Sequence, residues 1–150
     1  MLGADEHARK RIVHARPSAT STSLRTIYLV DTIEGIRPGL AGHLGRVVDG
    51  DLLTHHVGGQ GTFSTPAMIG LMEITSHRSV ERLLPEGHTT VGYEVHVRHL
   101  APTAPGATIE VTTRLTEVKG NKLYFEVECR EGAKLLGSGI HKRAIVPARF

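Results

Sequence analysis

Three residues that could take part in acyl transfer occur where the surrounding pattern predicts ordered structure. Thr65 stands at the start of a predicted helix, Glu73 lies within that helix, and His99 ends a predicted strand. A hydroxyl at a helix amino terminus, near a carboxylate and an imidazole, supplies the parts for nucleophilic or general-base acyl transfer. Spacing alone does not show that the three side chains meet.

Glu73 interrupts a run of apolar residues in the segment FSTPAMIGLMEITSH, residues 63–77. On a helix it shares a stripe with Ile69 and His77, on or beside the face that meets the rest of the domain. A buried carboxylate needs a partner, because burial without one is costly. Two interpretations stay open: an active-site glutamate, or a flanking residue that reaches solvent or pairs with His77.

His99 belongs to the alternating segment TTVGYEVHVRHL, residues 89–100, which predicts a strand. Strict alternation places it on one face with Val91, Tyr93, Val95 and Val97, and we expect that face to meet the helix. His99 is then either a hydrogen-bonded core or rim residue or a group that transfers protons. Thr65 likewise is either a helix cap or a reactive hydroxyl.

Other motifs that carry chemistry are absent from the sequence. There is no Walker lysine, no H-E-x-x-H, no paired C-x-x-C and no G-x-S-x-G. His96 alternates onto the face opposite His99, and the adjacent pair His55 and His56 has poor ligand geometry, so no metal site is predicted. Aromatic residues make up only 4% of the chain, too few for a base-stacking platform.

The elements that must position these side chains are one helix and several strands. Pro66 opens a helix to about Leu84, with Ser64 or Thr65 as the N-cap. Strands are predicted at the end of 35–48 and over 89–100, 107–118, 122–130 and 135–146, joined by short turns, and 24–30 is a further strand or an arm. The order favours an α+β fold in which a curved antiparallel sheet wraps around one long helix. The sheet edges of such a fold favour a dimer.

Length and composition fit one folded domain, predicted at 24–150, after a flexible amino-terminal appendage at 1–23. The charge of +3 includes the basic run HARKRIVHAR at 7–16, interpreted as a solvated tail in preference to a nucleic-acid contact. No apolar run is long enough to span a membrane. The single cysteine, Cys129, favours a reducing compartment, and we expect the cytoplasm.

Three segments of the sequence are similar to one known family. STPAMIGLME (64–73), VGYEVHVRHLAPTAPG (91–106) and GSGIHKRAIV (137–146) resemble the fluoroacetyl-CoA thioesterase-like family of hotdog-fold proteins, and IRPG (36–39) and LTEVKGNKLYFEV (115–127) extend the likeness. The resemblance implies a hotdog fold, a homodimer or higher oligomer, and acyl-CoA sites at the dimer interface. No cofactor is expected, because CoA is part of the substrate.

The resemblance also implies roles for individual residues. The catalytic set of the family falls on Thr65, Glu73 and His99, and the resemblance adds Gly92 and Arg143 as substrate-binding residues. The family discriminates its fluorinated substrate with aromatic groups upstream of the threonine. Here Gly59 stands near the place of an aromatic gate residue, and Phe63 is the aromatic residue close by.

The expected function is therefore hydrolysis of a small acyl-CoA thioester without selectivity for fluoroacetyl-CoA. The main alternative is a non-catalytic hotdog protein that binds acyl-CoA or another small ligand. A hotdog hydratase is a weaker alternative, because its Asp-x-x-x-x-His pattern is missing.

Overall fold

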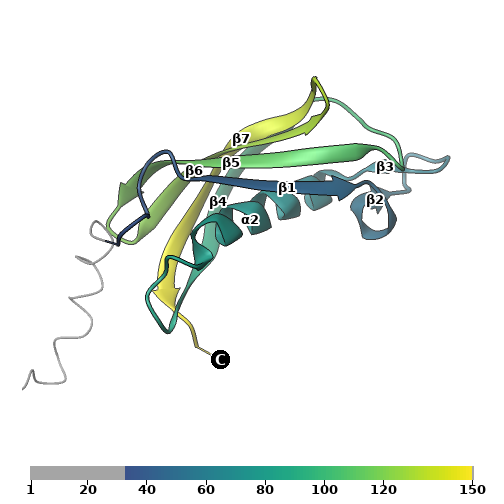
Figure 1. Cartoon of the computed structure of the whole chain (residues 1–150). Coiled ribbons are helices and arrows are strands. Elements are labelled where there is room, and N and C mark those ends of the chain that lie inside the picture. Colours follow the sequence, from purple (N-terminus) through teal and green to yellow (C-terminus); the bar gives the residue numbers. More distant parts are fainter. Residues whose placement is uncertain (1–32, 150) are drawn as a thin grey trace, which may run out of the picture.

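The computed structural model describes residues 33–149. Five strands form one antiparallel sheet in the order β1-β5-β6-β7-β4, and helix α2 (Thr65–Glu81) lies along its concave side (Figure 1). The strands are β1 (Ala41–Val47), β4 (His88–His99), β5 (Thr108–Lys119), β6 (Lys122–Glu131) and β7 (Lys134–Pro147). The prediction of an α+β fold with a curved sheet around one helix is confirmed. The predicted appendage at 1–23 and the strand or arm at 24–30 lie outside the described residues.

A short connection leads from β1 to the helix. It contains a 3₁₀ turn, η2 (Gly50–Leu52), and a two-stranded hairpin of β2 (Leu53–Thr54) and β3 (Thr62–Phe63). Ser64 then caps the helix, because its hydroxyl accepts a hydrogen bond of 3.1 Å from the N–H of Ala67. The helix ends at Glu81, before the predicted end at Leu84. Leu84 precedes a proline, which disfavours helical backbone at that position.

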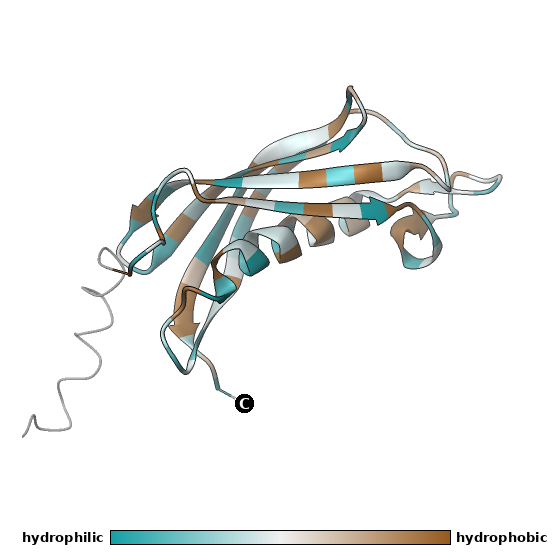
Figure 2. Cartoon of the chain, in the orientation of Figure 1, coloured by the Kyte–Doolittle hydropathy of each residue, from teal (hydrophilic) through white to brown (hydrophobic). Residues whose placement is uncertain are grey.

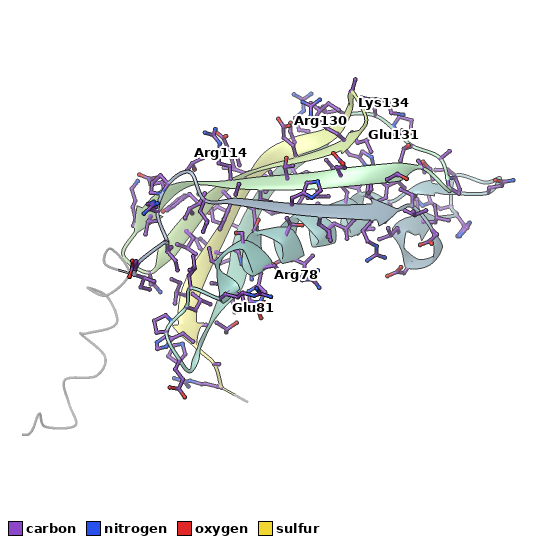
Figure 3. The ribbon with its side chains drawn as sticks, in the orientation of Figure 1. Arg78, Glu81, Arg114, Arg130, Glu131 and Lys134 are labelled. Atoms are coloured by element: carbon purple, nitrogen blue, oxygen red, sulfur yellow. The ribbon has the colours of Figure 1, made fainter. Side chains whose placement is uncertain are left out.

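The core lies between the helix and the sheet. Alternate residues of the strands point inward, and Figure 2 shows the resulting alternation of apolar and polar residues along the sheet. The buried apolar side chains include Met68, Met72 and Val80 of α2, Ile109, Val111 and Leu115 of β5, and Leu123, Phe125, Val127 and Cys129 of β6. The outer face carries charged residues, and Figure 3 shows Arg114 and Arg130 directed away from the helix. The helix thus covers only the inner face of the sheet.

Strand β4 contains a β-bulge at Tyr93, where two residues of β4 oppose one position of β7. Gly92 pairs with Arg143 and Glu94 with Lys142, so Tyr93 is the extra residue. Gly92 and His99 are an odd number of residues apart, and a regular strand would place them on opposite faces. Because the bulge shifts the alternation by one residue, both face the helix.

The prediction that alternate residues from Val91 to His99 share one inward face is therefore wrong for the residues up to the bulge. Val91 and Tyr93 lie on the outer side of the sheet, where they are 45% and 44% exposed, and Lys122 Nζ lies 5.4 Å from the centre of the Tyr93 ring. Thr90 and Gly92 take the inner positions instead. Beyond the bulge, Val97 packs against the core, as the alternation predicts.

The two edges of the main sheet differ in length. β1 forms a short edge, whereas β4 forms a longer edge without a neighbouring strand on its far side among residues 33–149. Long unpaired edges invite pairing with another chain. Ile74 of α2 and Val95 of β4 are also exposed apolar residues. Within residues 33–149, no helix is long and apolar enough to cross a membrane.

Candidate active site

The first part of the site joins the start of α2 to the end of β4. Thr65 Oγ1 lies 2.7 Å from His99 Nδ1, within hydrogen-bond distance. The capped helix start positions the threonine, and the phase set by the bulge turns the histidine toward it. If the hydroxyl donates, Nδ1 accepts and can take up its proton. This geometry allows His99 to activate either Thr65 or a water molecule.

The environment of His99 is unusual for a residue with a purely structural role. The Phe63 ring packs edge-on against the imidazole, with ring centres 6.0 Å apart. His99 Nε2 is buried and has no hydrogen-bond partner among the described residues. An unpaired buried polar atom costs about 1–3 kcal/mol, so a residue that served only packing would be better replaced by an apolar one. Exceptions to the rule that buried polar atoms are hydrogen-bonded occur mainly at functional sites.

A cleft of about 760 Å³ opens beside this pair. Thr65, His99 and Phe63 line it, together with apolar residues of the flanking segments, namely Leu53, Val57, Pro66, Leu100, Ala101 and Pro102. The cleft is mostly apolar, which is typical of a site for a small molecule. Its polar lining comes from the helix start and His99 on one side and from Thr54, His56 and Thr62 of the β2–β3 hairpin on the other. A substrate carbonyl in this cleft could approach the hydroxyl–imidazole pair.

The helix amino terminus offers few free N–H groups. Ala67 donates to the Ser64 hydroxyl, Met68 donates to the Ser64 carbonyl, and Pro66 has no N–H. Within residues 33–149, this leaves the N–H of Thr65 as the one group of the first helical turn that could stabilise an oxyanion.

The second part of the site lies further along α2. Arg143 Nη1 is 3.4 Å from Glu73 Oε1 and from the Glu73 carbonyl oxygen, so the partner of Glu73 is Arg143 and not His77. Gly92 makes this position possible. A Cβ atom at residue 92 would lie 2.2 Å from Glu73 Oε1. The glycine therefore leaves the space that the carboxylate occupies.

The two parts do not meet within one chain. Thr65 and Glu73 are about 12 Å apart along the helix axis at 1.5 Å per residue, and no hydrogen bond joins Glu73 to Thr65 or His99 among the described residues. The prediction that Thr65, Glu73 and His99 form one catalytic set therefore needs a second chain. Their catalytic roles stay a prediction.

The remaining candidates lie in or near the loop before the helix. Gly59 is exposed, with φ of 62°, and a Cβ there would meet nothing within 4 Å. His55 and His56 are also exposed. Over residues 33–149, no group of three potential ligands is placed to hold a metal ion.

Sequence reasoning missed two buried polar residues next to Arg143. Thr90 and His141 both touch its guanidinium and are almost fully buried. A usable signal was present in the sequence. His141 shares the inward alternation of β7 with Arg143 and Ile145, and polar residues at consecutive inward positions indicate a buried network.

One long helix wrapped by a curved antiparallel sheet defines a hotdog-fold protein, and solved structures of hotdog-fold proteins are similar to this chain. Residues 47–149 match the family model described as fluoroacetyl-CoA-specific thioesterase, FlK, and the chain belongs to this family. The resemblance noted in the sequence is thus confirmed.

Individual relatives agree with this assignment. A fluoroacetyl-CoA thioesterase of Streptantibioticus cattleyicolor is 38% identical over 84 residues, which cover 56% of this chain and 60% of the relative, so the match spans three fifths of that protein. A structure of the fluoroacetyl-CoA thioesterase FlK is 31% identical, with a TM-score of 0.70, over 76% of this chain and 90% of that chain. A mutant of FlK in complex with fluoroacetate and CoA is 31% identical, with a TM-score of 0.68, over 75% of this chain and 96% of that chain.

Proposed function

We propose that this protein hydrolyses a small acyl-CoA thioester at a site completed by two copies of the chain. The observation that carries the proposal is the Thr65–His99 hydrogen bond in an apolar cleft, with His99 Nε2 buried and unpaired among the described residues. Membership in the thioesterase family and the fluoroacetate and CoA bound to the FlK mutant support an acyl-CoA substrate. The reaction needs no cofactor, because CoA is part of the substrate.

The proposed second copy brings the two parts of the site together. Two β4 edges that pair antiparallel about an axis near Val95 and His96 place His99 of one copy opposite Gly92 of the other. Glu73 of the partner subunit then lies near the cleft that holds Thr65. The exposure of Val95 and Ile74 supports this pairing, because it would cover both apolar side chains.

The chemistry follows from this arrangement. An oxygen nucleophile attacks the thioester carbonyl, the carbon–sulfur bond breaks, and the products after water has added are a carboxylic acid and the CoA thiol. His99 accepts the proton of the attacking hydroxyl and returns it to the departing thiolate. Glu73 orients or activates the nucleophile. The nucleophile is a water molecule, the Thr65 hydroxyl or Glu73 itself. If the Glu73 carboxylate attacks, it brings no proton, and His99 takes the proton from the water that then hydrolyses the mixed anhydride.

The proposed substrate range is broader than fluoroacetyl-CoA. Gly59 stands where an aromatic gate is expected, and its open surroundings provide no side chain to close on a two-carbon acyl group. Phe63 is buried against His99 and is not free to act as such a gate. Cytoplasmic location also stays a prediction, based on the single cysteine.

Release of CoA thiol from a panel of acyl-CoAs tests the proposed activity. The panel contains acetyl, fluoroacetyl, branched and aromatic acyl groups. We expect turnover of at least one member, and values of kcat/KM for acetyl and fluoroacetyl that differ by less than about tenfold, or 1.4 kcal/mol. A strong preference for fluoroacetyl-CoA would contradict the proposed range. Binding of acyl-CoA by a folded protein without thiol release would instead indicate the non-catalytic alternative.

Val95→Asp tests the proposed assembly. Two aspartates facing each other near the two-fold axis would repel and lose hydration, so the dimer should dissociate and thiol release should fall with it. Light scattering coupled to size exclusion measures the mass. Val47→Asp is the matched control, because it places the same charge at the opposite edge of the sheet. A monomeric Val95 variant with unchanged kcat would show that one chain is sufficient.

A further inference from the structure

A network of buried polar side chains lies behind Glu73. Its centre is Arg143 on β7, which is 5% exposed, and His141, two residues earlier on the same face, is 2% exposed. Side chains with this degree of burial are costly unless each polar group is paired. The partners of the guanidinium therefore indicate what the network does.

Besides Glu73, three acceptors contact the Arg143 guanidinium. Its Nε donates to Thr90 Oγ1 at 2.9 Å, Nη2 donates to the Thr90 carbonyl at 2.8 Å, and Nη1 lies 3.1 Å from His141 Nε2. Nη1 also points toward the carboxylate and the carbonyl of Glu73. Because the group is planar, these contacts fix its plane and the direction from which it meets Glu73.

His141 can only serve as an acceptor here. Its Nδ1 lies 3.2 Å from the Glu94 carbonyl, which is an acceptor, so Nδ1 carries the proton and the lone pair of Nε2 faces Arg143. Burial and the neighbouring Arg143 lower the pKa of His141, which keeps the ring neutral. A protonated ring would lose the lone pair at Nε2 and repel the guanidinium.

The network does not provide a route for protons to Glu73. His77 Nδ1 lies 2.8 Å from Thr90 Oγ1, and His77 Nε2 lies 3.6 Å from Glu81 Oε1, so polar groups do connect the network to the surface. Arg143 interrupts that connection, because an arginine does not give up its proton in proteins. What the network can supply to Glu73 is orientation.

We propose that His141 is a positioning residue for acyl-CoA hydrolysis: its neutral Nε2 fixes the Arg143 guanidinium, which in turn holds the Glu73 carboxylate beside Gly92. Thr90 assists from the adjacent strand. This inference rests on the proposed function, in which Glu73 orients or activates the nucleophile. Active-site side chains need such a supporting layer to stay within about 0.5 Å of the productive geometry.

Two substitutions of His141 separate its role as an acceptor from its packing. In His141→Gln, the amide oxygen can accept from Nη1, whereas His141→Leu fills a similar space without an acceptor. We expect His141→Leu to lower kcat roughly 10²-fold, the effect of a misplacement of about 1 Å, with little change in KM. His141→Gln should restore most of kcat. Equal losses in both variants, or no loss in His141→Leu, would overturn the inference.

A measurement without substrate distinguishes failure of this inference from failure of the proposed function. Nitrogen-15 NMR of the folded protein reports the His141 tautomer and the exchange rate of the Arg143 Nε–H. We expect Nδ1–H on His141, and slow exchange at Arg143 that is lost in His141→Leu and kept in His141→Gln. Unchanged exchange in His141→Leu would overturn the positioning role even if the wild type hydrolysed no acyl-CoA. Absence of turnover with the expected spectra would count against the proposed function alone.

Discussion

His99→Ala is expected to lower the kcat for acyl-CoA hydrolysis by about 10²–10⁴-fold, the contribution typical of a positioned general acid–base group. The substitution removes Nδ1, the atom that pairs with the Thr65 hydroxyl. It also removes the buried Nε2, which has no partner among residues 33–149. The stability lost with the packing of the ring should therefore be partly offset by loss of an unsatisfied polar atom.

His43→Ala is the matched control for this experiment. His43 lies on β1, at the edge of the sheet opposite β4, where it is exposed and 3.9 Å from Glu110. Its removal should leave kcat and KM close to those of the wild type. Initial rates of thiol release, with circular dichroism to confirm the fold, measure both variants. If His99→Ala kept the wild-type kcat, His99 could not be the proton-transfer group.

Gly92→Ala is the second substitution for which a large effect is expected, because the new methyl group would occupy the space of the Glu73 carboxylate. Its carbon would lie 2.2 Å from Glu73 Oε1 and 2.9 Å from His141 Cε1. The carboxylate ends a flexible side chain and can rotate away, whereas the buried His141 ring has little room to move. We expect a loss of kcat of roughly 10²-fold and a decrease of about 1–3 kcal/mol in the free energy of unfolding.

Gly45→Ala provides the control for the general effect of adding a methyl group to a strand. Gly45 lies on β1, and a Cβ there would meet nothing within 4 Å. Its kcat should be unchanged, and its stability should be equal or slightly higher. Urea unfolding and thiol release compare the two variants. Full activity in Gly92→Ala would show that Glu73 does not act from its present position.

The sequence was sufficient to predict the elements of the fold because their signals are local. Ser64 and Pro66 mark the helix start by capping chemistry, and the alternation along 107–118 and 122–130 marks two strands with one buried face. Packing of one helix against one sheet then leaves few architectures. The family resemblance added the hotdog name and the candidate residues.

What the sequence did not show depends on contacts between distant segments. Gly92 within the strand was a signal for the bulge at Tyr93, but strict alternation was applied across it, so the residues before the bulge were assigned to the wrong face. The pairing of Glu73 with Arg143 joins residues far apart in the chain, and a helix pattern alone favoured His77 because it lies one turn away. Likewise, spacing could not show that Glu73 and His99 lie apart within one chain.

The extra residue in β4 also restricts how this chain can change during evolution. A deletion of one residue between Glu94 and His99, with the bulge kept, would preserve a continuous strand and most of its backbone hydrogen bonds, yet it would turn Gly92 and His99 toward opposite faces. In the proposed two-fold pair, this one deletion would be present in both chains and would alter both sites at once. Strand β4 can therefore tolerate many changes of side chain, whereas a change of length by one residue beyond the bulge would leave a strand that still folds but no longer presents both residues to the site.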